Sequence, residues 1–256
     1  MFQKRVVVCL DVRDGKTTKG VKFKGNVDIG DPVEMAAAYY EQGVDELVFY
    51  DITASSEKRG IMIDVVARVA ETIFIPFCVG GGIRTLDDMK RVIDAGAEKV
   101  SINSAAVRTP GLIEEGASHF GAQCVVLGMD AAADKDMPSG YRVVIDGGRV
   151  ATEWDMLDWA REAVRLGAGE IVLNSIDTDG VKQGYEINAT RLVSEAVTVP
   201  VVASGGAGVP QHLADVLKEG KADAALVASM VHYGDYTIND IKRHLNKEGV
   251  PVRKTW

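Results

Sequence analysis

The strongest constraint on the fold is an internal repeat. Residues 75–83 (IPFCVGGGI) match residues 199–207 (VPVVASGGA), 124 positions further along the chain. Residues 43–49 match residues 167–173 at the same spacing. Self-similarity over half of a chain indicates that a folding unit has been duplicated. The repeat therefore predicts a symmetric fold in which corresponding segments lie opposite each other.

Each half alternates short apolar runs with helical segments. The runs lack polar alternation, which is typical of strands buried on both faces of a parallel sheet. They cover residues 5–11, 46–50, 76–79, 99–103, 123–129, 170–174, 200–203 and 222–228. This alternation predicts parallel strands with right-handed crossovers, and the repeat favours their closure into a (β/α)8 TIM barrel. We expect one domain over residues 1–256, with half-barrels at about 1–122 and 123–256.

Two connections are longer than the others. Residues 12–30 are rich in lysine and glycine, which is typical either of a lid or of a solvated surface loop. In residues 131–150, a β-branched run precedes Asp146 and two glycines, which predicts a hairpin. The runs that end on Asp11 and Asp130 are 119 rather than 124 positions apart. The difference places an insertion in this second loop.

Composition excludes several classes of function. The net charge of −8 argues against non-specific nucleic-acid binding and against a basic membrane patch. Cys9, Cys78 and Cys124 lie in apolar runs without a CxxC pair, so we expect buried free thiols. The histidines lack metal-ligand spacing, and we expect no metal and no cofactor. The absence of a signal peptide and of an apolar run of roughly 20 residues predicts a cytoplasmic protein.

The ends of the predicted strands carry the candidate catalytic residues, because active sites of such barrels lie at the C-terminal strand ends. The residues at these positions are Asp11, Asp51, Gly81, Asn103, Asp130, Ser175, Ser204 and Ala228. The repeat places Asp11 opposite Asp130. Paired carboxylates suit general acid–base catalysis, although a lone strand-end aspartate is often a helix cap.

Glycine turns follow the third and seventh predicted strands. Such turns ahead of helices offer backbone N–H groups to phosphate oxygens. One side of the barrel mouth combines its turn with two polar residues (Gly81, Gly82, Asn103, Ser104), and the other side has an equivalent set (Ser204, Gly205, Gly206, Ala228, Ser229). Two such sites predict a substrate with a phosphate at each end and reactive atoms between the two aspartates.

Several motifs together resemble the cyclase subunit of imidazole glycerol phosphate synthase, a family of histidine biosynthesis. The resemblance extends over residues 4–253. It rests on residues 9–15 (CLDVRDG), 19–20 (KG), 51–55 (DITAS), 80–83 (GGGI), 100–104 (VSINS), 177–180 (DTDG) and 203–208 (ASGGAG). It implies a half-barrel duplication and a lyase that joins ammonia to a ribulosyl formimino-aminoimidazole carboxamide bis-phosphate. The products would be imidazole glycerol phosphate and aminoimidazole carboxamide ribotide.

The resemblance also implies roles for individual residues. Asp11 and Asp130 would be the acid–base pair, and Lys19 would help the first long loop to close over substrate. Phosphate contacts would come from one side of the mouth (Gly82, Asn103, Ser104) and from the other (Asp179, Gly180, Gly206, Ala228, Ser229). The turn at Asp146 departs from the family pattern, in which a hydroxyl, histidine or aromatic residue often precedes the glycines. We therefore assign no catalytic role to it.

A glutaminase partner is implied as the source of ammonia. In this family it docks at the N-terminal face of the barrel to form a heterodimer, and ammonia passes a ring of charges there. The matching residues are Arg5, Glu46, Lys99 and Glu170, each at the start of a predicted strand. A purely structural set of ion pairs that plugs the barrel is the alternative interpretation of these four.

Three other functions fit the same fold. One is the isomerase of the same pathway, which also has two phosphate sites and two aspartates. Another is a cyclase-like, ammonia-dependent enzyme of surface-sugar amidation. The third is a non-catalytic barrel that regulates a glutaminase. Residues 51–55 and the charge ring favour the cyclase over the isomerase.

Overall fold

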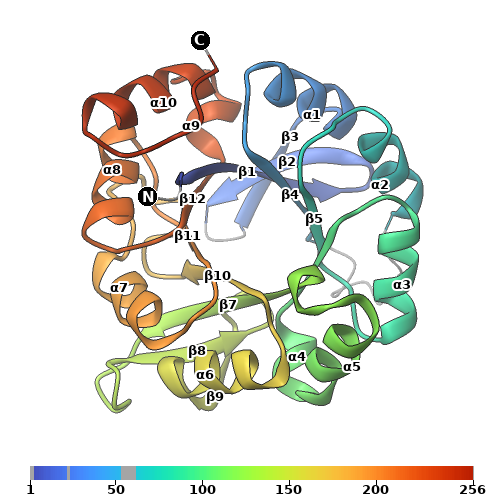
Figure 1. Cartoon of the computed structure of the whole chain (residues 1–256), viewed down its shortest axis with the longest axis vertical. Helices are drawn as coiled ribbons and strands as arrows, with labels where there is room; N and C mark the ends of the chain where they lie inside the picture. The colour runs from blue at the N-terminus through green and yellow to red at the C-terminus, as the bar shows by residue number, and fades with distance from the viewer. Residues whose placement is uncertain (1–2, 22–23, 53–61, 256) are drawn as a thin grey trace.

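A closed ring of eight parallel strands forms the centre of the molecule (Figure 1). The computed structural model describes residues 3–21, 24–52 and 62–255, and the backbone alone for 19–21 and 24–27. The strands of the ring, in order of pairing, are β10 (Glu170–Ser175), β11 (Val201–Ser204), β12 (Ala224–Val227), β1 (Arg5–Arg13), β4 (Glu46–Asp51), β5 (Phe77–Gly80), β6 (Lys99–Ile102) and β7 (Val125–Ala133). Pairing of β7 with β10 closes the ring. The predicted (β/α)8 barrel is confirmed.

Helices surround the barrel and follow its strands in sequence (Figure 1). The long ones are α1 (Pro32–Glu41), α2 (Ile63–Ala70), α3 (Leu86–Asp94), α5 (Gly111–Phe120), α6 (Met156–Leu166), α7 (Ile187–Ala196), α8 (Pro210–Lys218) and α10 (Ile238–Lys247). Their ends follow local rules of capping. Asp31 accepts hydrogen bonds from the first turn of α1, and Thr237 and Asp240 form a capping box at the start of α10. None of the helices in the described ranges has the length and apolar character that a membrane span requires.

The barrel strands bury side chains on both faces. On β1, Val6, Val8 and Leu10 pack outward against the helices, and Val7 and Cys9 point inward. The inward side chains of all strands but β6 form a second apolar group, which we call the inner cluster (Val7, Cys9, Val48, Cys78, Val126, Val172, Val202, Ala224, Leu226). Burial on both faces explains why the strands read as unbroken apolar runs.

Both long connections contain antiparallel strands. In the first, β2 (Lys16–Val21) pairs with β1 and with β3 (Lys24–Gly30), so the connection of residues 12–30 contains a hairpin that the sequence did not predict. Its role as a lid or as a surface loop stays a prediction. The sequences of these strands, KTTKGV and KGNVDIG, carry neither an apolar run nor a strict alternation of apolar and polar residues, which are the patterns that predict a strand. In the second, β8 (Tyr141–Ile145) pairs with β7 and with β9 (Val150–Asp155), which confirms the predicted hairpin.

Two short helices that the sequence did not predict begin directly after β6 and β12. These are α4 (Ser104–Arg108) and α9 (Ser229–His232). Asn103 and Ala228, the residues before them, share an unusual backbone geometry, with φ/ψ of −124°/−95° and −141°/−83°. The position and geometry of both helices favour the duplication, while the half-barrel boundaries near residue 122 stay a prediction.

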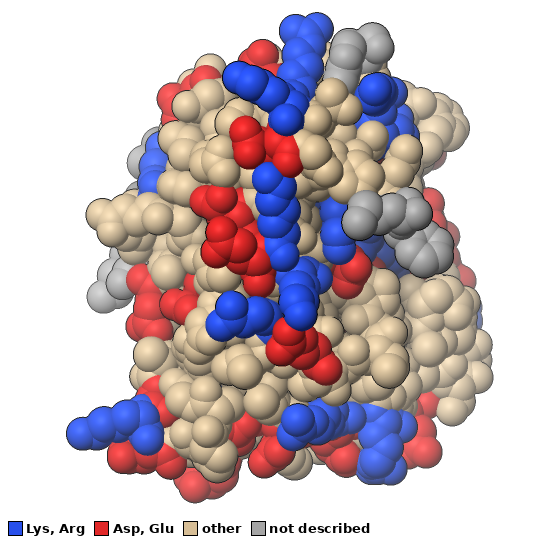
Figure 2. Space-filling model, turned by 60° about the vertical axis from the view of Figure 1, so that its left-hand side comes forward, with Lys and Arg blue, Asp and Glu red and all other residues tan. Residues whose placement is uncertain are grey.

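The cysteines are free thiols. Cys9 and Cys78 are buried as expected, whereas Cys124 is only half-buried because it ends the 3-10 turn η1 (Ala122–Cys124) at the barrel rim. On the outside, acidic and basic side chains are interleaved over one flank of the molecule (Figure 2). Pairs among the outer helices include Lys218 with Glu248 at 3.3 Å. Each such exposed pair contributes at most about 1 kcal/mol to stability.

Candidate active site

A cavity of about 880 Å³ opens at the C-terminal ends of the strands. Both predicted catalytic aspartates line it, together with every predicted phosphate-contact residue from the two sides of the mouth. Lys19 lies in β2, and its side chain is outside the part of the chain that the structure describes. Thr53, Ala54 and Ser55 of the DITAS motif are likewise outside the described residues. Asp51, the first residue of that motif, is buried and lines the cavity.

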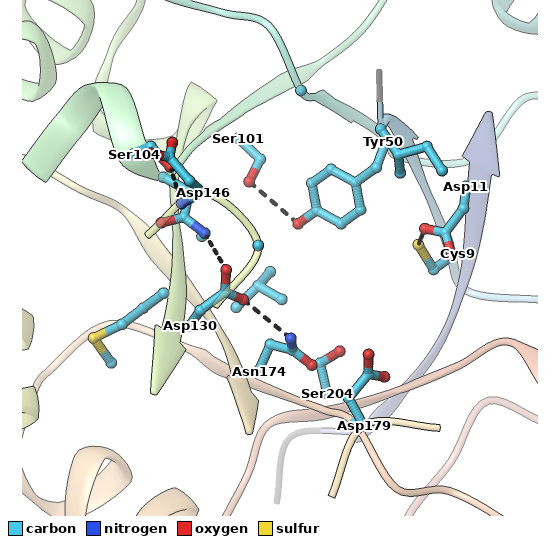
Figure 3. A pocket seen from close by; sticks show the side chains of 18 of the residues that line it. Cys9, Asp11, Tyr50, Ser101, Ser104, Asp130, Asp146, Asn174, Asp179 and Ser204 are labelled. Carbon is cyan, nitrogen blue, oxygen red and sulfur yellow. Dashed lines mark hydrogen bonds between the residues drawn. The ribbon is translucent and has the colours of Figure 1, made fainter. Parts of the chain in front are cut away.

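Asp130, on β7, is held by two amide donors. The Asn103 side chain donates to Oδ2 and the Asn174 side chain donates to Oδ1, each at 3.0 Å (Figure 3). Burial raises the pKa of Asp130 to about 6, although both amides lower it; the charge of Asp179 adds to the increase. A carboxyl group with such a pKa exchanges protons readily near neutral pH.

Asp11 projects from β1 on a different side of the cavity from Asp130 (Figure 3). The Cys9 thiol donates a hydrogen bond to its Oδ1 at 3.3 Å. Because side chains on a strand alternate between faces, Cys9 and Asp11 both point into the barrel. The site therefore holds two carboxyl groups in different settings, one bound by a thiol and one by two amides.

The two glycine turns have left-handed backbones that only glycine adopts without strain. Gly81 has φ +84° and Gly206 has φ +106°. A Cβ atom at Gly81 would lie 2.2 Å from the Asp51 carbonyl oxygen, and one at Gly206 would lie 2.0 Å from the Gly184 carbonyl oxygen. The first turn thus lies against the end of β4, and the second lies against the loop between β10 and α7. Both turns therefore require glycine for two reasons: the left-handed backbone and the close approach of a neighbouring carbonyl group.

The β8–β9 turn is fastened to the first-half side of the mouth. The backbone N–H of Asp146 donates to the Ser104 hydroxyl at 3.0 Å, and its carboxylate pairs with Arg108 at 2.5 Å. Asp146 and Gly147 have φ of +55° and +67°, the left-handed backbones that an Asp-Gly pair commonly adopts in a hairpin turn. All three residues line the cavity. The departure from the family pattern at residue 146 thus lies beside a predicted phosphate site.

Sequence reasoning missed several residues of the cavity. Tyr50, Ser101 and Asn174 point inward from barrel strands. Because every second residue of a strand faces the same side, counting back from the strand ends could have identified them. Four cationic side chains also line the wall: Arg84, Arg108, Arg149 and Lys182. They lie in loops and at the end of α4, where no periodic signal exists.

The four predicted ring residues lie together at the opposite, N-terminal end of the barrel. Arg5 pairs with Glu46, and its Nη2 is 2.7 Å from Glu170. Lys99 pairs with Glu46 at 2.8 Å and with Glu170 at 2.5 Å. We call this closed cycle of alternating charges the charge cluster. Burial alone would lower the pKa values of Arg5 and Lys99. The negative charges of the two glutamates have a larger effect, so both pKa values are raised.

Residues 3–21, 24–52 and 62–255 contain no group of three or more His, Cys, Asp and Glu side chains arranged to hold a metal ion.

Replacement of Asn174 by alanine is expected to shift the pH dependence of the site. The amide lowers the pKa of Asp130, so its loss should raise that pKa above about 6. We expect the inflection of kcat/KM between pH 5 and pH 9 to move to higher pH. A shift of the acidic limb of the pH profile would identify Asp130 as the general base. A shift of the alkaline limb would identify it as the general acid. Asn246→Ala, exposed on α10, is the control; equal profiles for both variants would contradict the prediction.

Comparison with known proteins agrees with this geometry. A family model described as "Histidine biosynthesis protein" matches residues 5–237. The imidazole glycerol phosphate synthase subunit HisF of Desulfatibacillum aliphaticivorans is 69% identical over 256 residues, which cover 99% of this chain and 98% of that protein. The protein of the same name from Syntrophobacter fumaroxidans is 66% identical over 259 aligned positions, with 100% of both chains covered. That of Nitratidesulfovibrio vulgaris is 59% identical, again over 100% of both chains.

Proposed function

The chain belongs to the imidazole glycerol phosphate synthase subunit HisF family of histidine biosynthesis, whose members are cyclases of the lyase class, and from this premise we propose how its cavity acts. The proposed substrates are ammonia and the ribulosyl formimino-aminoimidazole carboxamide bis-phosphate. The products are imidazole glycerol phosphate and aminoimidazole carboxamide ribotide. One observation carries the proposal: a single cavity holds Asp11 and Asp130 between two glycine turns.

The two aspartates would manage the protons of the reaction. Addition of ammonia to the ribulosyl carbonyl requires a proton at the carbonyl oxygen and removal of a proton from the added nitrogen. A positioned acid and a positioned base contribute roughly 10²- to 10⁴-fold to such a step. The pKa of about 6 at Asp130 suits either role near neutral pH. Asp11 is the second group, and its thiol donor keeps it oriented into the cavity.

Each end of the cavity would hold one phosphate. The first-half end combines Gly82, Asn103 and Ser104 with three nearby guanidinium groups (Arg84, Arg108, Arg149). The second-half end combines Asp179, Gly180, Gly206, Ala228 and Ser229 with the ammonium group of Lys182. Backbone N–H groups and arginines both suit phosphate oxygens. The presence of two such sets in one cavity favours a bis-phosphate over a single-phosphate ligand, and Lys19 would close over it.

The N-terminal face would receive the partner. The relatives are named as subunits of a synthase, which places them in a complex. We propose that the partner of this chain is a glutaminase that docks over the charge cluster and releases ammonia there. The cluster lies at the starts of the barrel strands, on the face away from the cavity.

A direct test supplies the ribulosyl bis-phosphate and a high concentration of ammonium salt to the isolated chain. Formation of imidazole glycerol phosphate without any partner is the expected result. No product under these conditions, from protein shown to be folded by circular dichroism, would overturn the proposed reaction. The isomeric ribosyl bis-phosphate is the control, since turnover of that compound would indicate the isomerase instead.

Lys99→Ala is expected to lower glutamine-driven turnover more than ammonia-driven turnover. Removal of Lys99 leaves two buried glutamates with one cation, Arg5, which disturbs the passage at the partner face and leaves the cavity intact. Both rates should be measured on the complex with its glutaminase. Lys90→Ala removes a lysine from an exposed pair with Asp94 and serves as the matched control. Equal losses in both assays would mean that the charge cluster is only structural.

A further inference from the structure

The interior of the barrel is layered along its axis. Inward positions on a strand recur every second residue, so β4 presents Glu46, Val48 and Tyr50 in succession. These belong to the charge cluster, the inner cluster and the cavity wall respectively. Over this span the strand rises about 13 Å. The apolar inner cluster therefore separates the charge cluster from the cavity.

Tyr50 lies at the boundary between the inner cluster and the cavity. Its ring packs against the inner cluster, and the half-buried side chain also lines the cavity. Its hydroxyl is 3.3 Å from the hydroxyl of Ser101, the inward residue of β6 between Lys99 and Asn103 (Figure 3). Figure 3 shows the ring reaching inward, with Asp11 on one side and Asp130 on the other. Tyr50 thus forms part of the cavity floor.

The neighbouring strands leave room for this ring. A Cβ atom at Gly80 would lie 2.6 Å from Cε1 of Tyr50 and 3.0 Å from Cβ of Ser101. A Cβ atom at Gly128 would lie 3.1 Å from the Ser101 hydroxyl oxygen. Glycine inside a strand often marks such a close approach by another group. The aromatic ring therefore has a formed seat inside the barrel, where it extends from β4 over β5 toward β6.

We propose that Tyr50 is an inner gate between the charge cluster and the cavity, a role that rests on the proposed function. Its ring covers the apolar interior, and its hydroxyl, with that of Ser101, binds ammonia as it arrives. Neutral ammonia crosses an apolar layer far more easily than ammonium does, because burial of an unpaired charge is costly. The hydroxyl donates to the ammonia nitrogen and the Ser101 oxygen accepts an N–H. Tyr50 is a positioning residue, because it acts on delivery of ammonia.

The chemistry of the phenol suits this task. Burial raises the pKa of Tyr50 well above its ordinary value, so the hydroxyl keeps its proton and remains a donor. Its contact with Ser101 is long for an O–H···O hydrogen bond, whose usual length is about 2.7–2.8 Å. A small polar molecule can therefore bind between the two hydroxyls with little loss of existing bonding.

Tyr50→Phe in the complex with the glutaminase tests the gate. The ring is retained, so the barrel should fold, while one hydrogen bond to ammonia is lost. We expect the ratio of glutamine-driven to ammonia-driven turnover to fall about fivefold, which corresponds to one hydrogen bond. Ammonium added from solution enters through the open mouth, so ammonia-driven turnover should stay within about twofold of the wild type. Tyr236→Phe, at a tyrosine outside the cavity, is the control.

Ser101→Ala provides a second variant that keeps Tyr50 in place and should lower the same ratio. An unchanged ratio in both variants would overturn the gate. Equal loss of both activities would also overturn it, since Tyr50 would then act in the chemistry or in the fold. These outcomes differ from a failure of the proposed function itself. In that case the wild type would form no product from ammonium salt either.

Discussion

Asp130→Asn is expected to reduce ammonia-driven turnover by at least about a hundredfold, the lower end of what general acid–base catalysis contributes. Asparagine preserves the size of the side chain but can neither release nor accept the proton at this position. Product formation at saturating ammonium is the measurement. Asp64→Asn, an exposed change on α2, should leave turnover unchanged. Turnover by Asp130→Asn close to that of the wild type would remove Asp130 from the mechanism.

The same variant should remain folded, and its stability gives an independent check. The folded-state pKa of Asp130, about 6, lies above the ordinary value of 3.8. A raised folded-state pKa contributes stability that is present below about pH 4 and is lost as pH rises through 6. The buried charge should therefore cost the wild type about 3 kcal/mol at pH 8 relative to pH 4, since one pKa unit corresponds to about 1.4 kcal/mol.

Urea unfolding of both proteins between pH 4 and pH 8 would measure this effect. The difference in free energy of unfolding between Asp130→Asn and wild type should increase with pH in favour of the variant. A difference that does not change with pH would mean that Asp130 has no raised pKa in the folded state.

Gly206→Ala is expected to destabilise the protein by at least about 3 kcal/mol and to raise the KM for the bis-phosphate. The methyl group would meet the Gly184 carbonyl oxygen at 2.0 Å, and φ of +106° adds about 1–3 kcal/mol of strain. The second turn would have to shift, which displaces its N–H groups from the phosphate. Thermal or urea unfolding and substrate titration are the measurements.

Gly140→Ala is the matched control for this prediction. Gly140 also has a left-handed backbone, with φ +83°, but nothing lies within 4 Å of an added Cβ. It should cost only about 1–2 kcal/mol and leave KM unchanged. If both variants lose the same free energy of unfolding and keep the same KM, the destabilisation at Gly206 comes from its φ alone. The close approach of the Gly184 carbonyl would then contribute nothing.

The barrel was predictable because its signals are local and repeated. Each strand is buried on both faces and therefore appears as an apolar run, and the 124-residue repeat relates the two halves. The aspartates and the glycine turns were recognisable for a similar reason, since they follow directly after such runs. The hairpin of β2 and β3 was missed because its sequence carries neither an apolar run nor a strict alternation of apolar and polar residues.

The cavity depends more heavily on contacts between distant segments. Asn103, just beyond β6, and Asn174, on β10, reach Asp130 from either side of β7. Burial at this position raises the pKa of Asp130, while both amides lower it. No spacing in the chain reveals an electrostatic environment, because it depends on what the fold excludes from water. Arg108 and Asp146 meet across 38 residues, and their pairing follows only from the packing of the β8–β9 turn on α4.

Local pattern was thus enough for the order of the eight barrel strands and their long helices, the internal repeat, the strand-end aspartates and the glycine turns. Tertiary packing was needed to decide which side chains share the barrel axis and at what depth. Glu46, Val48 and Tyr50 are near neighbours on one strand, yet they belong to three different layers. The physical reason is barrel closure: it brings inward residues of all eight strands together, and only their joint packing separates a charged entrance, an apolar interior and a polar cavity.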